Sequence, residues 1–337
     1  MYGRIFTGLL ACVVLGCSLL VTALIAGENR ILLRPGLDPR GKQFYVNRLQ
    51  AFCEQLECHT CPSGAVCFEL TCNQNMFLDP THRRSILLCH GNAGTALDFE
   101  PLLNKFTKLF DTIYIVEYRG YGCASTRSSA VQQSSISPKD LVEDLREIMG
   151  LLETSRRQPV TVLLGYSIGG GVITQWLRQS LEVPEPSKYH PIQQVVCLNS
   201  FASIPQLVDE HVPWFSTAIK SVMQCQWNTA KALQFILQVR PEMKVLWVNT
   251  RDDHLIGTKH TDAIRHALSE SRTENIVFVE LPNGDHAGSV FVHSEEWMSK
   301  LLERPDETSM LLRAFGESNS QSDSETKCEK TTDVCDK

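Results

Sequence analysis

Short runs of apolar residues recur along the middle of this chain, and segments with helical spacing separate them. The apolar runs cover residues 85–89, 112–118, 160–164, 194–198, 244–248 and 276–281. Apolar residues three and four positions apart predict helices between them, most clearly over 97–110, from 137 onward and over 172–181. Strands that are apolar throughout and alternate with amphipathic helices are typical of a parallel sheet covered on both faces. We therefore predict an α/β fold with a mostly parallel sheet.

The helix that follows residue 137 has the clearest start signal. Ser137 is a good N-cap, Pro138 suits the first helical position, and Asp140 can complete a capping box. We expect the apolar face of this helix to be buried; it comprises Leu141, Leu145, Ile148, Met149 and Leu152.

The N-terminus carries a longer apolar run, from Ile5 to Ala26, with no charged residue between Arg4 and Glu28. As a helix it would span the roughly 30 Å core of a bilayer. A cleaved signal peptide would have a shorter apolar core; Val21 to Ala23 could still serve as its cleavage site, and Leu15 to Cys17 faintly resembles a lipoprotein box. The length favours an uncleaved membrane anchor over residues 1–27.

Two features of the sequence give opposite predictions for the side of the membrane on which the main domain lies. Basic residues follow the anchor, at Arg30, Arg34, Arg40 and Lys42, and the positive-inside rule then places the main domain in the cytoplasm. A dense group of cysteines instead favours local disulfides and an extracytoplasmic or lumenal domain; it comprises Cys53, Cys58, Cys61, Cys67 and Cys72. Zinc and reduced thiols are the alternatives, and zinc is disfavoured because no second Cys-x-x-Cys partners Cys58 and Cys61.

Composition sets the remaining limits. A net charge of −6, a pI near 5.9 and the lack of a basic stripe with interleaved aromatics give no support for nucleic-acid binding. Residues 28–79 are predicted to be an irregular, cysteine-rich region, residues 80–316 the α/β domain, and the polar residues 317–337 a disordered tail. Nothing in the sequence indicates the oligomeric state.

Candidate chemistry is concentrated at Gly165 to Gly169, where Ser167 stands between an apolar strand and a helix. Strand, sharp turn and helix together form a nucleophile elbow, and glycines around the serine allow the close approach of strand and helix. The turn exposes the serine oxygen and places the N–H of Ile168 at a helix N-terminus, where it can face an oxyanion.

A serine hydroxyl needs a base, and the base needs an orienting acid. Strand 276–281 leads into a loop with His286, which Gly284 and Gly288 flank. Strand 244–248 leads into Asp252 and Asp253, of which Asp253 is favoured as the acid; the other reading is that one of the pair caps the next helix. The order serine, aspartate, histidine is that of the α/β-hydrolases.

A second oxyanion donor is expected in the loop His90 to Gly94, from the N–H of Asn92. His90 itself follows a strand but precedes the serine in the chain, so we expect its imidazole to support the loop rather than act as the base.

Four motifs in order carry a family resemblance: His90 to Gly94 (HGNAG), Glu117 to Gly122 (EYRGYG), Gly165 to Gly170 (GYSIGG) and Asn199 to Ile204 (NSFASI). The chain resembles the membrane-tethered α/β-hydrolase-domain serine hydrolases over residues 86–303. The resemblance implies an α/β-hydrolase fold with a small helical cap over 201–239, and catalytic roles for Ser167, Asp253 and His286. It also implies hydrolysis of esters or thioesters, since some relatives remove fatty acyl groups from protein cysteines.

The chain departs from the family pattern at three points. Glu117 stands where aspartate is usual, Gly257 replaces the proline usual after the acid, and the cysteine group has no counterpart.

The expected function is that of a membrane-anchored serine hydrolase acting on an acyl ester or thioester, without cofactor or metal. A peptidase or amidase on the same fold and a catalytically silent interaction module are the alternatives. The sequence of the cap does not indicate the acyl chain length or the identity of the substrate.

Overall fold

The computed structural model describes residues 33–36, 38–72, 84–124, 136–155, 157–183, 191–269 and 275–301. The predicted anchor over residues 5–26 and the predicted tail over 317–337 lie outside this part of the chain. Within the described ranges, no helix combines the length and the apolar composition needed to cross a membrane.

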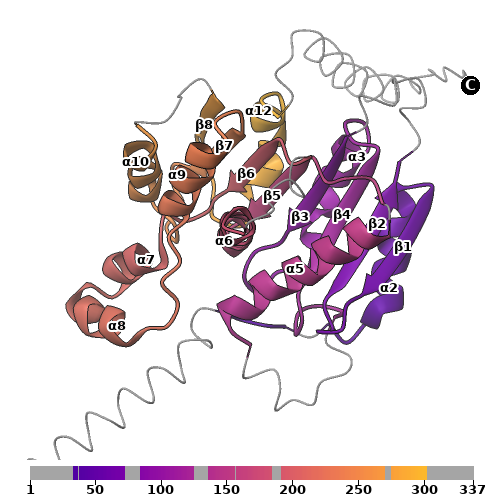
Figure 1. Cartoon of the computed structure of the whole chain (residues 1–337), viewed down its shortest axis with the longest axis horizontal. Coiled ribbons are helices and arrows are strands. Elements are labelled where there is room, and N and C mark those ends of the chain that lie inside the picture. Colours follow the sequence, from indigo (N-terminus) through magenta and orange to yellow (C-terminus); the bar gives the residue numbers. More distant parts are fainter. Residues whose placement is uncertain are drawn as a thin grey trace, which may run out of the picture. The chain divides into compact units, whose positions relative to one another are not determined.

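Eight strands form one sheet, in the order β1-β2-β4-β3-β5-β6-β7-β8 (Figure 1). Their bounds are β1 Gln55–Thr60, β2 Val66–Thr71, β3 Ser85–Cys89, β4 Thr112–Glu117, β5 Val162–Tyr166, β6 Gln194–Leu198, β7 Lys244–Thr250 and β8 Ile276–Leu281. The pairs from β4 to β8 are all parallel, as predicted. Every residue of β3, β4, β5 and β6 is buried, so these strands are covered on both faces.

Register brings the carboxyl ends of the parallel strands to one edge of the sheet. Cys89 at the end of β3 lies opposite Gly165 on β5, and Leu198 at the end of β6 lies opposite Tyr166. On the other side, Thr250 at the end of β7 lies opposite Leu281 at the end of β8. The loops that follow these strands therefore start side by side, which is where open α/β sheets bind their ligands.

Helices connect the parallel strands, and α5, α6 and α9 lie on the near side of the sheet in Figure 1. The helices of this part are α3 Glu100–Phe106, preceded by the short 3₁₀ helix η4 Ala96–Phe99, then α5 Pro138–Thr154, α6 Ile168–Leu181, α9 Thr229–Val239, α10 Thr258–Ala267 and α11 Ser289–Val292. Helix α5 begins as predicted: Asp140 accepts the Ser137 N–H at 2.7 Å, and the predicted apolar face is buried. Helix α6 begins immediately after Ser167, so Ile168 stands at a helix N-terminus as expected.

Residues 28–79 were predicted to be irregular, and here the structure differs. After helix α2 (Gly41–Leu49) and the 3₁₀ helix η1 (Gln50–Phe52), β1 and β2 form an antiparallel hairpin, and β2 pairs antiparallel with β4. Polar residues obscured these strands: Glu69 on β2 is buried, and His59 on β1 lies beside it with a 2.9 Å contact between its Nε2 and the Glu69 carboxylate. The hairpin extends the sheet by two strands.

The predicted disulfides of this region are not seen in the structure, in which all five cysteines are free. One physical reason is the hairpin register: Cys58 faces Phe68 across the strands while Cys67 faces His59, so Cys58 and Cys67 point to opposite faces. Burial raises the pKa of the Cys53 and Cys61 thiols to about 11 and that of Cys72 to about 12, so these thiols are protonated at neutral pH.

An excursion between β6 and α9 contains α7 (Ile204–His211), the 3₁₀ helix η6 (Pro213–Phe215) and α8 (Ser216–Val222). An antiparallel bridge between Ser203 and Asn228 closes its base. This cap is shorter than the predicted range 201–239, because α9 packs against α6 as part of the layer over the sheet and buries its apolar face. A second compact unit begins at Ser294, and its described part contains α12 (Ser294–Met298).

Candidate active site

Ser167 lies on the turn between β5 and α6, in the strained backbone conformation φ 53°, ψ −117°. The glycines around it are required by close packing. A Cβ on Gly165 would lie 2.3 Å from the Gly169 carbonyl, and a Cβ on Gly169 would lie 2.2 Å from the Cys89 carbonyl oxygen. A non-glycine residue with positive φ is uncommon and is held only by its surroundings. The predicted elbow geometry is therefore present at Ser167.

His286, in the loop after β8, connects Ser167 to an aspartate. Its Nε2 is 2.9 Å from Ser167 Oγ, and its Nδ1 is 2.6 Å from Asp253 Oδ2. Both ring nitrogens are thus engaged, with the acid on Nδ1 and the hydroxyl on Nε2. In this arrangement an imidazole accepts the hydroxyl proton while the acid holds its tautomer and orientation.

The structure separates the two candidate acids. Asp253 is buried, and its second oxygen, Oδ1, accepts the N–H groups of Leu255 at 2.8 Å and Ile256 at 2.9 Å. Asp252 is exposed. The backbone amides orient the Asp253 carboxylate so that its other oxygen meets His286.

Both predicted oxyanion donors lie at this edge of the sheet, one at the start of α6 and the other in the loop after β3. Ile168 is the first residue of α6, and the first N–H groups of a helix have no partner within it. In the loop after β3, the Asn92 side-chain oxygen accepts the Arg34 N–H at 2.6 Å, the Ala93 N–H at 3.0 Å and the Tyr121 hydroxyl at 3.3 Å. The last of these contacts joins the HGNAG and EYRGYG motifs, and together they hold the loop in place.

His90 supports this loop from below, as predicted, and its partner is Glu117. Both side chains are fully buried, with His90 Nε2 3.1 Å from Glu117 Oε1. His90 Nδ1 lies 2.8 Å from the Gly91 carbonyl oxygen, and Glu117 Oε2 accepts the Ala96 N–H at 3.1 Å. Burial by itself would lower the pKa of His90, but the Glu117 carboxylate has the larger effect together with the backbone, so this pKa is raised. Burial also raises the pKa of Glu117.

Two residues that sequence reasoning did not assign hold the histidine loop. The Tyr166 hydroxyl donates to the His286 carbonyl oxygen at 2.8 Å, and Asn199 Nδ2 donates to the same oxygen at 3.1 Å. The Tyr166 and His286 rings also stack, 5.6 Å apart. Tyr166 is inside the elbow motif and Asn199 directly follows β6, so their positions were a usable signal, but the shared acceptor becomes visible only in three dimensions.

A cavity of about 620 Å³ opens beside Ser167 and His286. Apolar surface comes from Ala93, Tyr166, Leu255, Ala287 and Phe291, and charged groups come from Arg34 and Asp98. A cavity of this size is in the range that holds a small organic ligand or part of an acyl chain.

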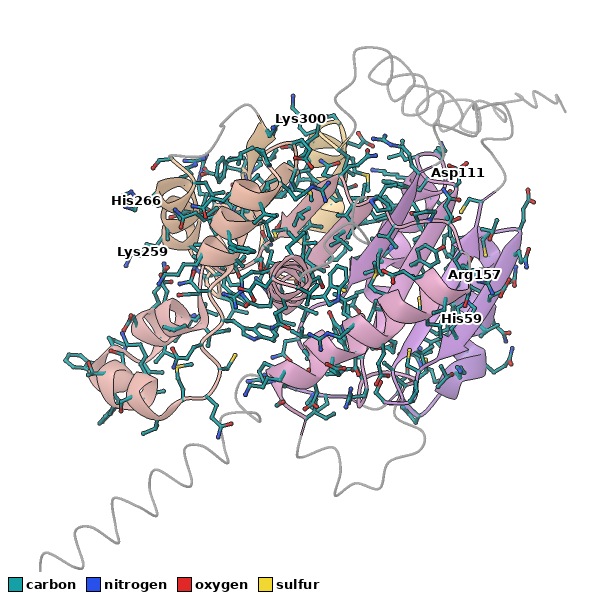
Figure 2. The ribbon with its side chains drawn as sticks, in the orientation of Figure 1. His59, Asp111, Arg157, Lys259, His266 and Lys300 are labelled. Carbon is teal, nitrogen blue, oxygen red and sulfur yellow. The ribbon has the colours of Figure 1, made fainter. Side chains whose placement is uncertain are left out.

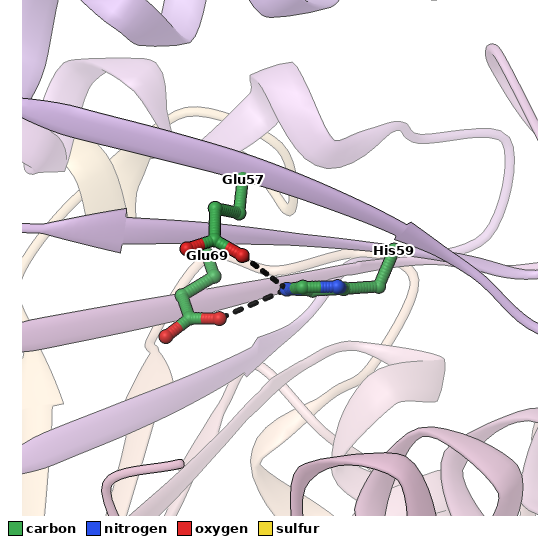
Figure 3. Close-up of side chains that lie close together, drawn as sticks. All are labelled: Glu57, His59 and Glu69. Atoms are coloured by element: carbon green, nitrogen blue, oxygen red, sulfur yellow. Dashed lines mark hydrogen bonds and ion pairs between the residues drawn. The ribbon is translucent and has the colours of Figure 1, made fainter. Parts of the chain in front are cut away.

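One side-chain cluster in the described part of the chain has the composition of a metal site, at Glu57, His59 and Glu69 (Figure 3). His59 Nε2 is 2.9 Å from Glu69 and 3.9 Å from Glu57. Arg157, labelled near His59 in Figure 2, contacts the same carboxylates at 2.7 Å and 3.2 Å. Because the guanidinium already balances these charges, the cluster is better explained as an ion-pair network that joins the hairpin to the segment before β5.

Comparisons with known proteins agree with this architecture. Residues 84–224 match a family model described as the α/β-hydrolase fold. An esterase from Pyrococcus furiosus is similar in structure, with a TM-score of 0.54 and 13% identity over 78% of this chain and 92% of the esterase. A puromycin-hydrolysing peptidase from Mycobacterium tuberculosis has a TM-score of 0.53 and 14% identity over 73% of this chain and 39% of the peptidase.

In sequence, 95 residues are 25% identical to a monoacylglycerol lipase from Mycolicibacterium smegmatis, which is 28% of this chain and 32% of the lipase. The chain therefore matches about a third of the length of that curated relative. Together with the sheet order, these likenesses confirm the predicted α/β-hydrolase fold. At such low identity these likenesses show the fold alone. The reaction depends on the residues of the site.

Proposed function

We propose that this α/β-hydrolase-fold protein is a serine hydrolase that cleaves a carboxylic ester or thioester, and that residues 5–26 anchor it in a membrane. The observation that carries the reaction is the unbroken contact from Ser167 Oγ through His286 to Asp253, at 2.9 Å and 2.6 Å, on the wall of a cavity.

In the proposed mechanism Ser167 Oγ attacks the substrate carbonyl carbon while His286 Nε2 takes the hydroxyl proton. The N–H groups of Ile168 and Asn92 stabilise the oxyanion of the tetrahedral intermediate. His286 then returns the proton to the leaving alcohol or thiol, which departs and leaves an acyl-serine. Water attacks this ester with His286 again as base, releasing the acid and restoring the serine.

Asp253 keeps the His286 proton on Nδ1, so that Nε2 is free to act as the base, and it stabilises the imidazolium that forms. Tyr166 and Asn199 act as positioning residues, because they fix the backbone of the histidine loop from two sides.

The cavity indicates the substrate class. Its apolar wall at Leu255 and Phe291 suits an acyl chain, and a membrane anchor would bring the site to acyl chains in the bilayer. An acylated protein or a lipid ester is the substrate class that fits both the apolar cavity wall and the proposed anchor. The basic residues after the anchor favour a cytoplasmic site, whereas cysteine density favoured the opposite side, so topology stays a prediction.

A fluorophosphonate probe, which reacts with activated serines, tests the assignment on membranes that carry the full-length protein. We expect Ser167→Ala to abolish labelling and Asp253→Asn to slow it by roughly 10³- to 10⁴-fold, because the wrong histidine tautomer is then favoured. Asp252→Asn is the matched control and should label within about twofold of the unmutated rate, since Asp252 is exposed and does not contact His286.

Absence of labelling in the unmutated protein would refute the hydrolase assignment. Equal slowing by both aspartate variants would refute the role of Asp253. A panel of acyl esters, acyl thioesters and peptide amides then separates an esterase from a peptidase.

A further inference from the structure

The cap carries an apolar surface that nothing in the described structure covers. Trp214 is 91% exposed and Phe215 is 67% exposed, and neither η6 nor α8 contains a buried residue. Residues 212–219 include no charged side chain; we call this segment the cap tip. Figure 1 shows α7 and α8 projecting away from the sheet. Large side chains exposed together in this way mark a surface that binds something.

The cap tip is connected to the catalytic cavity. His211, directly before it, contacts the Leu255 carbonyl oxygen at 2.7 Å through Nε2, and Leu255 lines the cavity while 50% exposed. Val292, which is 76% exposed, follows the cavity residue Phe291. Exposed apolar side chains therefore lie beside the cavity wall in two places, in the loop after Asp253 and at the end of α11.

The N-terminal segment also reaches this cavity. Leu33 is buried in the core, and Arg34 lines the cavity and donates its N–H to Asn92. The apolar run ends at Ala26, and the seven peptide steps from there to Leu33 extend at most roughly 25 Å. If residues 5–26 span a membrane, the wall of the catalytic cavity at Arg34 therefore lies close to its surface.

We propose that the cap tip docks on the lipid bilayer through Trp214 and Phe215, so that the catalytic cavity opens toward the membrane and receives its ester from the bilayer. This inference rests on the proposed function. Tryptophan and phenylalanine are favourable at the boundary between headgroups and acyl chains, where an uncharged segment can insert. The exposed Arg34 side chain suits anionic headgroups. A protein could also cover aromatic side chains, but the bilayer is favoured because the anchor would keep it within reach.

The test uses the full-length protein reconstituted in vesicles, with two substrates in the same preparation. One is a long-chain ester held in the bilayer, and the other is a short-chain ester dissolved in the surrounding water. For the double variant Trp214→Ser/Phe215→Ser we expect kcat/KM on the bilayer ester to fall about tenfold or more, given the transfer energies of such side chains. Hydrolysis of the dissolved ester should stay within about twofold, because neither residue lines the cavity.

Two further variants make the comparison specific. Val239→Ser removes an exposed apolar side chain at the end of α9, away from the cap tip, and should leave both rates unchanged. Trp214→Phe keeps the side chain apolar and should preserve most of the activity on the bilayer ester.

Tryptophan fluorescence provides a readout that does not depend on catalysis. The other four tryptophans, Trp176, Trp227, Trp247 and Trp297, are buried. Vesicles with brominated acyl chains should therefore quench the unmutated protein more than Trp214→Phe, and equal quenching would overturn the proposal. Equal loss of activity on both esters would overturn the proposal in favour of a structural role for the two aromatic residues. Loss of activity on a dissolved acylated peptide without vesicles would overturn it in favour of a protein partner. If no ester is cleaved and no probe reacts, the proposed function has failed, while quenching still reports on docking.

Discussion

At the scale of single residues, the buried pair of His90 and Glu117 explains how two separate motifs together hold the loop after β3. The Gly91 carbonyl can only accept, so His90 Nδ1 must carry a proton and donate it. His90 Nε2 lies 3.1 Å from Glu117 Oε1, and both side chains are shielded from water. The attraction between the imidazole and the carboxylate fixes the start of the loop that contains Asn92.

Removing one member of this pair should destabilise the protein strongly. We expect Glu117→Leu to lower the free energy of unfolding by roughly 3–5 kcal/mol, because His90 is left buried without its partner. Denaturant unfolding measures this, and Glu153→Gln on the exposed side of α5 is the control, with an expected change within about 0.5 kcal/mol. Similar stability of the two variants would show that the pair does not support the loop.

At the scale of elements, a buried histidine joins α10 to the base of the cap. His260 Nδ1 accepts the Ala202 N–H at 3.0 Å, and its side chain is fully buried. Burial lowers the pKa of His260, and the neighbouring His211 lowers it further. The Glu210 carboxylate, 3.5 Å from His260 Nε2, acts in the opposite direction and raises it. A proton on Nδ1 would remove the acceptor, so the neutral ring is the form that the fold requires.

This geometry predicts acid sensitivity of a definite sign. A pKa below the unfolded value of 6.5 means that the unfolded chain binds the proton more readily. The contribution of His260 is therefore fully present above pH 6.5 and is lost as the pH falls, by up to about 1.4 kcal/mol per pH unit. Denaturant unfolding between pH 5 and 8 should show a flatter pH dependence for His260→Asn than for the exposed control His266→Asn. Identical slopes would contradict the assignment.

At the scale of the whole molecule, the segment before residue 80 is part of the hydrolase fold. Five of the six residues of β2 are buried, and all six pair with β4. Leu33 is in the main core, and Arg34 contacts the loop after β3 through Asn92. The sequence-based boundary at residue 80 therefore passes between strands of one sheet.

Truncation tests that boundary directly. A chain of residues 80–337 exposes the edge of β4 and loses the Arg34 contact, so we expect it to aggregate or to lack a cooperative thermal transition. A chain of residues 28–337 keeps both and should unfold cooperatively. Circular dichroism during heating distinguishes the two, and cooperative unfolding of the shorter chain would show that the hairpin is dispensable.

Local patterns were sufficient wherever neighbouring residues decide the structure. The apolar runs predicted β3 to β8, Ser137 and Asp140 predicted the start of α5, and the glycines predicted the turn at Ser167. The hairpin was missed because its strands are short and contain charged residues, and the burial of Glu69 depends on partners at His59 and Arg157. The predicted range of the cap extended too far, because the apolar face of α9 does not indicate which helix it packs against.

What the sequence determined by itself is the class of fold, the strained elbow and the chain order of Ser167, Asp253 and His286, since spacing and glycine sterics are properties of short segments. Only the tertiary structure placed Asp253 rather than Asp252 against His286, paired His90 with Glu117, and brought Arg34 to the cavity beside Ser167. Each of those outcomes depends on which loops meet at the edge of the sheet. That meeting is set by strand order and register, which no single segment encodes.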